Sequence, residues 1–327
     1  MDKKLTQAIL ERIRQYHRII LSRHIRPDGD AVGSTFGLRE ILRDSYPDKE
    51  IFVINEDSSE YLDFLGKEEE QLPDEAYADA LLIVLDTATL GRISNSKHRF
   101  ARETIKIDHH IDTEPYGDLS LVEDGRASTC EMVAAFRALY PEELKLSRRA
   151  ATFLYTGMVT DTGRFRSREV NGDTLRLAAE MLDTGVDPEP IFAHLYLENF
   201  DYFKFKAYIY RKMKITANGV AYILIDDAMQ RQFGLSQEQA GTAVSFLDSI
   251  RGSLIWIAFI ENKEKEEIRV RLRSRFLPVH DIAEHWRGGG HVNAAGATVF
   301  NREEVRALLR EADRKLKNYK ETNTGWL

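Results

Sequence analysis

The chain has 327 residues, of which 43% are hydrophobic and 30% are charged, a balance typical of a globular protein with enough apolar material for two domains. Its 46 Lys and Arg against 53 Asp and Glu give a net charge of −7, which argues against a protein that coats long duplex nucleic acid through a broad basic surface. Cys130 is the only cysteine, which excludes an intrachain disulfide and a cysteine-based zinc site.

The apolar segments give no sign of a membrane protein. The first seven residues, Met1-Asp-Lys-Lys-Leu-Thr-Gln7, lack the apolar stretch of a signal peptide. The longest later apolar run, 254–260, is far too short to span a bilayer. We therefore expect a cytoplasmic protein with no membrane association.

Predicted strands and helices alternate through the first part of the chain. A helix over 3–18 is followed by a strand over 19–23, a helix over 31–43, and strands near 51–55, 81–85 and 104–107. Helical periodicity then continues through 128–139, 146–159, 173–182 and 190–197. This order predicts an α/β fold whose mostly parallel sheet is flanked by helices, in a first domain over 1–190.

A helical connector is expected over 191–215, and aromatic residues alternate with Lys and Arg over 201–214 of this segment. Base-stacking side chains with phosphate-binding cations are one interpretation of this segment, but an amphipathic helix that buries one aromatic face is favoured. A smaller mixed α/β domain over 216–327 follows. Its predicted elements are a strand over 220–225, a helix over 236–249, a hairpin of 254–260 and 268–274, and helices over 279–286 and 303–317.

Acidic and imidazole side chains gather where the predicted elements of the first domain end. The ends carry His24-Ile-Arg-Pro-Asp28-Gly-Asp30, Asp86, Asp108-His109-His110 and Asp161. Because the carboxyl ends of parallel strands share one edge of a sheet, these residues can converge there. Helix caps and turns explain a single Asp in such a place, whereas the whole set favours a metal site.

The ligand types indicate the chemistry. Carboxylates and imidazoles together suit Mn²⁺, Mg²⁺ or Zn²⁺, and this set is larger than one ion needs. Two divalent ions can lower the pKa of a water molecule and clamp the oxygens of an in-line phosphoryl displacement. The sequence therefore predicts a two-metal site for phosphoester hydrolysis.

These motifs, in this order and spacing, resemble those of the DHH phosphoesterase superfamily. Near the C-terminus, Gly288-Gly-Gly-His291-Val-Asn293-Ala-Ala-Gly296 resembles the glycine-rich signature of the DHH-associated second domain. The resemblance implies two divalent ions, chiefly Mn²⁺ with Mg²⁺ or Co²⁺ as alternatives. The implied ligands are His24, Asp28, Asp30, Asp86, His109 and Asp161, with Asp86 bridging the ions. His110 would contact the substrate phosphate or assist the leaving group, and Asp108 would orient an imidazole.

The second domain carries the expected substrate contacts. Period-two alternation places Arg269, Arg271, Arg273 and Arg275 on one strand face, which is either solvated or binds phosphate. Glycines 288–290 would let backbone N–H groups approach an anion, aided by the dipole of a helix expected to begin at Val292. We expect substrate contacts from Arg271, Arg273, Ser274, Gly288, Gly289, Gly290, His291 and Asn293. Arg287 and Val292 depart from the commonest family pattern, in which glycine and proline often stand.

The combination of one DHH domain and one DHH-associated domain, without added modules, resembles the bifunctional oligoribonuclease and 3′-phosphoadenosine-5′-phosphate phosphatase branch of the superfamily. The resemblance implies hydrolysis of short RNAs, about two to five nucleotides long, and conversion of that bisphosphate to AMP by a monomer or homodimer. A cyclic-dinucleotide or linear-dinucleotide phosphodiesterase shares the same core and stays an alternative. A non-catalytic nucleotide sensor is the alternative from another class, but the complete ligand set argues against it.

Overall fold

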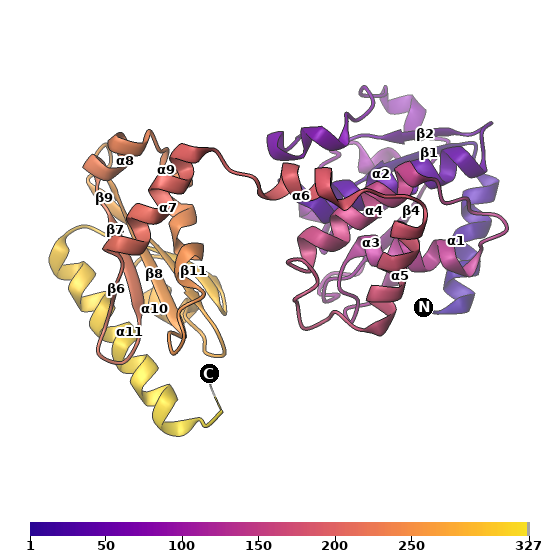
Figure 1. The fold of residues 1–327 in the computed structure, drawn as a ribbon. Coiled ribbons are helices and arrows are strands. Elements are labelled where there is room, and N and C mark those ends of the chain that lie inside the picture. Colours follow the sequence, from indigo (N-terminus) through magenta and orange to yellow (C-terminus); the bar gives the residue numbers. More distant parts are fainter. Residues whose placement is uncertain (326–327) are drawn as a thin grey trace. The chain divides into compact units, whose positions relative to one another are not determined.

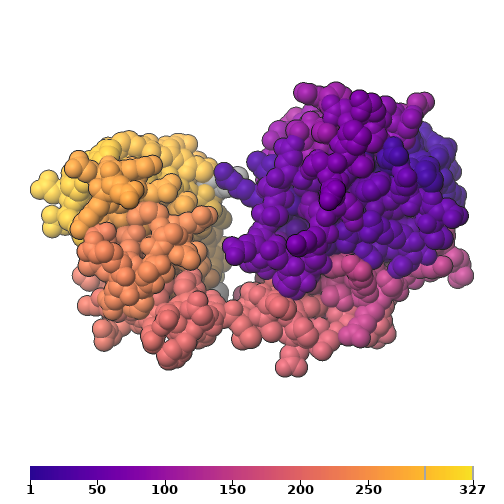
Figure 2. All heavy atoms as spheres, turned by 90° about the horizontal axis from the view of Figure 1, so that it is seen from above, coloured from indigo at the N-terminus to yellow at the C-terminus, as the bar shows by residue number. Residues whose placement is uncertain are grey.

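The computed structural model describes residues 1–325, except for the side chain of His291, and divides into two compact units, Met1–Leu197 and Glu198–Leu327. Each unit has hydrophobic clusters of its own, and Figure 2 shows the side chains of each unit closely packed. Among the described residues, no helix combines the length and hydrophobicity needed to cross a bilayer.

A sheet of five parallel strands forms the centre of the first unit (Figure 1). Its order is β2-β1-β3-β4-β5, from β1 (Arg18–Ser22), β2 (Glu50–Val53), β3 (Ala80–Leu85), β4 (Glu103–Asp108) and β5 (Leu119–Val122). All six residues of β3 are buried, because apolar clusters cover both faces of the sheet. The predicted α/β fold is confirmed, and β5 is a strand that the sequence pattern did not reveal.

Six helices surround this sheet: α1 (Lys3–Gln15), α2 (Gly29–Ser45), α3 (Thr129–Leu139), α4 (Arg148–Asp161), α5 (Gly172–Asp183) and α6 (Pro188–Tyr196). Short 3₁₀ turns connect the strands, among them η1 (Glu60–Leu65), η2 (Asp74–Tyr77), η3 (Leu90–Arg92) and η4 (His98–Phe100). Side-chain caps start the helices that carry site residues or support them. Asp28 caps α2, and Ser128 caps α3.

Glycines allow α2 and α4 to pack closely. A Cβ atom on Gly33 of α2 would lie 2.6 Å from the carbonyl oxygen of Phe153 and 3.0 Å from Cys130 Sγ. The facing Gly157 of α4 is equally constrained, since its Cβ would lie 2.1 Å from the same sulfur. Because α2 begins with Asp30 in its first turn and α4 ends at Asp161, this close packing sets how those carboxylates approach each other.

The second unit contains a six-stranded mixed sheet in the order β10-β11-β9-β8-β7-β6. The strands are β6 (Lys214–Ile215), β7 (Ala221–Ile225), β8 (Ile255–Asn262), β9 (Glu267–Ser274), β10 (Gly289–His291) and β11 (Ala294–Val299). Its helices are α7 (Phe200–Lys212), α8 (Asp227–Phe233), α9 (Gln237–Gly241), the 3₁₀ turn η5 (Thr242–Leu247), α10 (His280–His285) and α11 (Arg302–Thr322). Residues of β9 alternate between the core beneath α11 and an arginine face.

The segment predicted as a connector, 191–215, is shared between the two units. Its first residues belong to α6, whereas α7 buries Phe205 and Ile209 in the core of the second unit. One aromatic face of α7 is therefore packed, as the amphipathic interpretation requires.

Two local predictions in the second unit are wrong. The single helix expected over 236–249 is the short α9 followed by η5. The helix expected to begin at Val292 is instead the turn of the β10–β11 hairpin, because Ala294–Val299 pairs with β9 as a strand. A Cβ on Gly288 would lie 1.9 Å from the Gly296 carbonyl oxygen, so this glycine serves close backbone packing. In the described part of the chain, no helix therefore begins directly after glycines 288–290, and the expected dipole is not there.

We expect Gly33→Ala to lower the free energy of unfolding by about 1–3 kcal/mol, because the new methyl group must displace α4 backbone or Cys130. Urea denaturation measures this change. Gly125→Ala is the matched control, since nothing lies within 4 Å of a Cβ at that position. Equal stability of the two variants would contradict the inferred close packing.

Candidate metal centre

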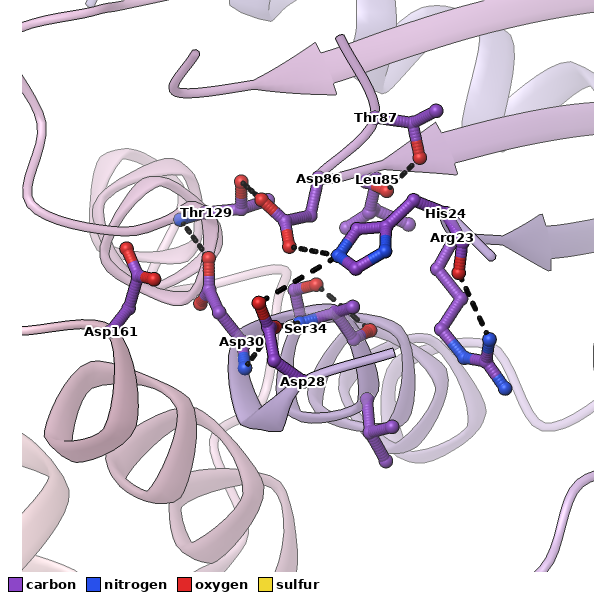
Figure 3. A network of polar contacts seen from close by, with 12 residues as sticks. Arg23, His24, Asp28, Asp30, Ser34, Leu85, Asp86, Thr87, Thr129 and Asp161 are labelled. Atoms are coloured by element: carbon purple, nitrogen blue, oxygen red, sulfur yellow. Dashed lines mark hydrogen bonds and ion pairs between the residues drawn. The ribbon is translucent and has the colours of Figure 1, made fainter. Parts of the chain in front are cut away.

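Different elements deliver the candidate ligands to one place, and Figure 3 shows His24, Asp28, Asp30, Asp86 and Asp161 among them. His24 follows β1, Asp86 follows β3, and His109 and His110 follow β4 at the carboxyl edge of the sheet. Asp86 has φ = 53°, a left-handed conformation that turns the chain sharply at the strand end. Asp28 caps α2, Asp30 lies in its first turn, and Asp161 is the last residue of α4.

The six predicted ligands converge. Nε2 of His24 lies 3.3 Å from Asp86 Oδ2 and 3.8 Å from Asp28 Oδ2. Nε2 of His109 lies 3.3 Å from Asp161 Oδ2, 3.6 Å from Asp86 Oδ1 and 4.0 Å from Asp30 Oδ2. Each of the sets His24–Asp28–Asp86 and Asp30–His109–Asp161 has donor atoms within 4.8 Å of one another.

The donor set fits divalent cations. Each set combines one imidazole nitrogen with two carboxylates, which suits Mn²⁺, Mg²⁺ or Zn²⁺. Nδ1 of His109 faces the Arg126 carbonyl oxygen at 3.2 Å, and a carbonyl can only accept a hydrogen bond. Nδ1 therefore carries the proton, and the Nε2 lone pair of His109 points at the carboxylates as a metal ligand requires.

The N-terminus of α3 holds two buried carboxylates of the site, Asp30 and Asp86. The Thr129 and Cys130 N–H groups donate to the two oxygens of Asp30 at 2.7 and 2.8 Å. The Thr129 hydroxyl also donates to Asp86 Oδ1 at 3.2 Å (Figure 3). Thr129 is not among the residues predicted from the sequence, although its place directly after the capping residue Ser128 marks a helix start. Cys130 is buried beside Asp30, and burial raises the pKa of its thiol well above the ordinary value.

His110 has a partner other than the ligands. Its Nδ1 lies 2.8 Å from Asp108 Oδ1 and 3.6 Å from Asp86 Oδ1. Asp108 is fully buried, and it belongs to none of the ligand sets found among the described residues. Burial alone would raise the pKa of Asp108, but the hydrogen bond from His110 and that imidazole's charge hold it below the ordinary value. This geometry suits the predicted role of Asp108 as the residue that orients an imidazole.

Repulsion among the carboxylates governs the electrostatics of the site. Burial, followed by the neighbouring carboxylates, raises the pKa values of Asp30 and Asp86, and it raises the pKa of Asp161 to about 7. Burial would lower the pKa of His109, but the charges of these three carboxylates raise it above the ordinary value. The site holds more negative charge than it can keep without protons or cations.

The predicted substrate residues separate into two groups. Arg271 and Arg273 project from β9 into a cavity of about 550 Å³ that Trp256 also lines. Among the described side chains, no carboxylate forms an ion pair with either arginine. Ser274 lies on the opposite face, where its hydroxyl donates to the Leu277 carbonyl oxygen at 2.6 Å.

The remaining predicted contacts fall in the β10–β11 hairpin. Gly289, Gly290 and His291 form β10, Gly288 precedes it, and the Asn293 carbonyl accepts from the Ser274 N–H at 3.0 Å. The side chain of His291 lies outside the described part of the structure, so its predicted contact stays a prediction.

Comparison with known proteins adds independent information. Residues 18–158 match the DHH family, N-terminal domain, and residues 217–318 match the DHHA1 domain. The bifunctional oligoribonuclease and PAP phosphatase NrnA of Bacillus subtilis is 34% identical over 95% of this chain and 98% of its own length. The chain belongs to the DHH family. A probable NrnA of Streptococcus mutans is also 34% identical, over 95% of this chain and 99% of its own.

Solved structures of the DHH family share the fold. The crystal structure of an exopolyphosphatase-related protein from Bacteroides fragilis superimposes with a TM-score of 0.82 and 25% identity, covering 98% of this chain and 97% of its own. The DHH match of this chain contains five of the six candidate ligands, and Asp161 lies three residues beyond its end. The DHHA1 match contains β9 and the glycine-rich hairpin.

We expect Thr129→Val to weaken Mn²⁺ binding about 10- to 100-fold, because the variant keeps the side-chain volume but loses the hydroxyl that holds Asp86. Isothermal titration calorimetry measures the affinity. Thr129→Ser, which retains the hydroxyl, is the control and should bind like the wild type. Equal affinities of the Val and Ser variants would rule out this role for the hydroxyl.

The metal-free protein should become less stable as the pH rises. Asp161 has an ordinary pKa of 3.8 and a folded-state pKa of about 7, so between these values the folded state binds more protons than the unfolded state. The loss of stability that is due to Asp161 is complete once the pH exceeds its folded-state pKa. We expect Asp161→Asn to gain thermal stability relative to the wild type at about pH 8, and to gain less at about pH 5. Differential scanning calorimetry in EDTA tests this difference, and a gain independent of pH would contradict it.

Proposed function

We propose that this chain is a metal-dependent phosphoesterase that hydrolyses short oligoribonucleotides to mononucleotides and converts 3′-phosphoadenosine-5′-phosphate to AMP. The observation that carries this proposal is the convergence of six ligands from five separate segments in a DHH-family chain. Relatives that match nearly the whole chain bear the names oligoribonuclease and PAP phosphatase, which supports the substrate class.

Two divalent ions, which we propose are Mn²⁺, would supply an activated water and clamp the phosphoryl oxygens when bound. His24 and Asp28 would hold one ion, Asp30, His109 and Asp161 would hold the other, and Asp86 would contact both. This assignment follows the two ligand sets, because Asp86 Oδ2 faces His24 while its Oδ1 faces His109.

His110 is proposed to act on the substrate directly. Asp108 engages its Nδ1, and 40% of the side chain is exposed, so the Nε2 edge stays available for a phosphate oxygen or a leaving group. The bond to Asp108 fixes the direction of that edge. The catalytic role thus falls to His110, with Asp108 as its orienting partner and Asp86 as the shared ligand.

The second unit is proposed to bind the remainder of the substrate. Arg271 and Arg273 are half-buried, and neither forms an ion pair with a described carboxylate, although Glu238 and Asp248 line the same cavity. Guanidinium suits bidentate phosphate binding. A cavity of about 550 Å³ has the size of a small-molecule site, which favours a nucleotide over a duplex. We assign metal chemistry to residues 1–190 and substrate binding to residues 216–327, in a cytoplasmic monomer or homodimer.

The test is product analysis with Mn²⁺ on an RNA dinucleotide, a long single-stranded RNA, 3′-phosphoadenosine-5′-phosphate and cyclic di-AMP. We expect mononucleotides from the dinucleotide, AMP from the bisphosphate, and little turnover of the long RNA. Asp86→Asn should abolish both activities, because it removes the charge of the shared ligand. Asp124→Asn, which changes an exposed acid outside the ligand sets, is the control and should retain them.

Other outcomes select other functions. Turnover of cyclic di-AMP alone would replace the proposal with a cyclic-dinucleotide phosphodiesterase. Binding of nucleotides without turnover of any substrate, in the presence of bound Mn²⁺, would favour a nucleotide sensor.

A further inference from the structure

A lysine lies buried in the strand that leads into the metal centre. Lys106 of β4 has no exposed side-chain surface, and its Nζ is surrounded by groups from three segments. Burying an ammonium group is costly, and a methionine would fill a similar volume without that cost. Core packing alone therefore does not account for a charged residue here.

Lys106 joins the two loops that follow β3 and β4. Its Nζ donates to the Ala88 carbonyl oxygen at 3.0 Å, two residues beyond Asp86. It also pairs with Asp112 Oδ1 at 3.1 Å, two residues beyond His110. The ring of Tyr116 lies 4.7 Å from the same nitrogen, and the Tyr116 hydroxyl donates to the Thr87 carbonyl oxygen at 2.6 Å. The loop after Asp86 and the loop after His110 are thus linked through one ammonium group.

Lys106 also reaches His110 through Asp108. Strand alternation places Lys106 and Asp108 on the same face of β4, with Nζ 3.7 Å from Asp108 Oδ2. That oxygen has no hydrogen-bond partner among the described residues, while Oδ1 contacts His110 Nδ1 at 2.8 Å. The Lys106 ammonium group therefore compensates the negative charge at Asp108 Oδ2, while Asp108 Oδ1 orients His110.

We propose that Lys106 is a positioning residue that fixes the direction of the His110 imidazole through Asp108 and holds the backbone on either side of the site. Lys106 itself does not touch the substrate. The kinetic consequence rests on the proposed phosphoesterase function, whereas the effect on His110 does not.

The first experiment observes His110 by proton NMR in the metal-free protein. The Nδ1 proton shared with Asp108 should give a downfield signal, assigned by its absence in His110→Gln. We expect Lys106→Met to shift or broaden this signal and Lys106→Arg to retain it in part. Lys49→Met is the matched control, because Lys49 also bonds backbone carbonyls, those of Arg14 and Tyr16, but contacts no site residue in the described structure. A signal that Lys106→Met leaves unchanged would overturn the proposal.

The second experiment measures kcat and KM for an RNA dinucleotide. Lys106→Met should lower kcat about 10- to 100-fold while KM changes by less than about threefold, and Lys49→Met should change neither. Equal kcat losses in the two variants would show a general structural effect and overturn the proposal. If Lys106→Met does not fold, Asp112→Asn replaces it, because it removes the negative charge that pairs with Nζ at a side chain that is 36% exposed. Its His110 signal must then shift or broaden relative to the wild type, or the proposal fails. An inactive wild type would refute the proposed function, and the NMR result would still decide the role of Lys106.

Discussion

Repulsion among buried carboxylates is the constraint on which this structure depends. Asp30 and Asp86 have almost no exposed surface, and both lie near Asp161 around the single imidazole of His109. Water cannot solvate these charges, so the protein must supply dipoles and the site must take up protons or cations. The N-terminus of α3 supplies dipoles, because two of its N–H groups donate hydrogen bonds to Asp30. The negative charge that remains favours a cation at this edge of the sheet.

The same constraint explains features of the fold that lie away from the ligands. Asp30 and Asp161 come from helices rather than strands, so their approach depends on how closely α2 and α4 pack. Glycines at 33 and 157 remove the Cβ atoms that would separate these helices, and Cys130 fills the space beside both. A small thiol thus has a packing role at the point where three helices meet the metal centre, and its burial keeps it protonated.

Local sequence nominated the candidate ligands but not the residues that support them. Metal ligands need specific residue types at strand ends, and His24, Asp86 and His109 stand out as members of such a set, not singly. Thr129 and Lys106 act through contacts with residues distant in sequence, such as Asp86 and Ala88, and no local pattern marks those contacts. The glycine-rich segment was predicted to start a helix because Ala294 and Ala295 are good helix formers. Pairing of that segment with β9 overrides the propensity, which is a tertiary effect.

The candidate sites of the two units carry opposite charges, and one class of ligand suits both. The first unit presents a surplus of carboxylates, which repel a phosphate unless cations intervene. In the second, no carboxylate of the described residues forms an ion pair with Arg271 or Arg273. Burial together with the neighbouring Arg271 lowers the pKa of Arg273, so this face gains from an anion. Under the proposed function, phosphate would satisfy both, directly at the arginines and through divalent ions at the carboxylates. The net charge of −7 does not exclude nucleotide substrates, because these two local sites, and not the charge of the whole surface, would recognise them.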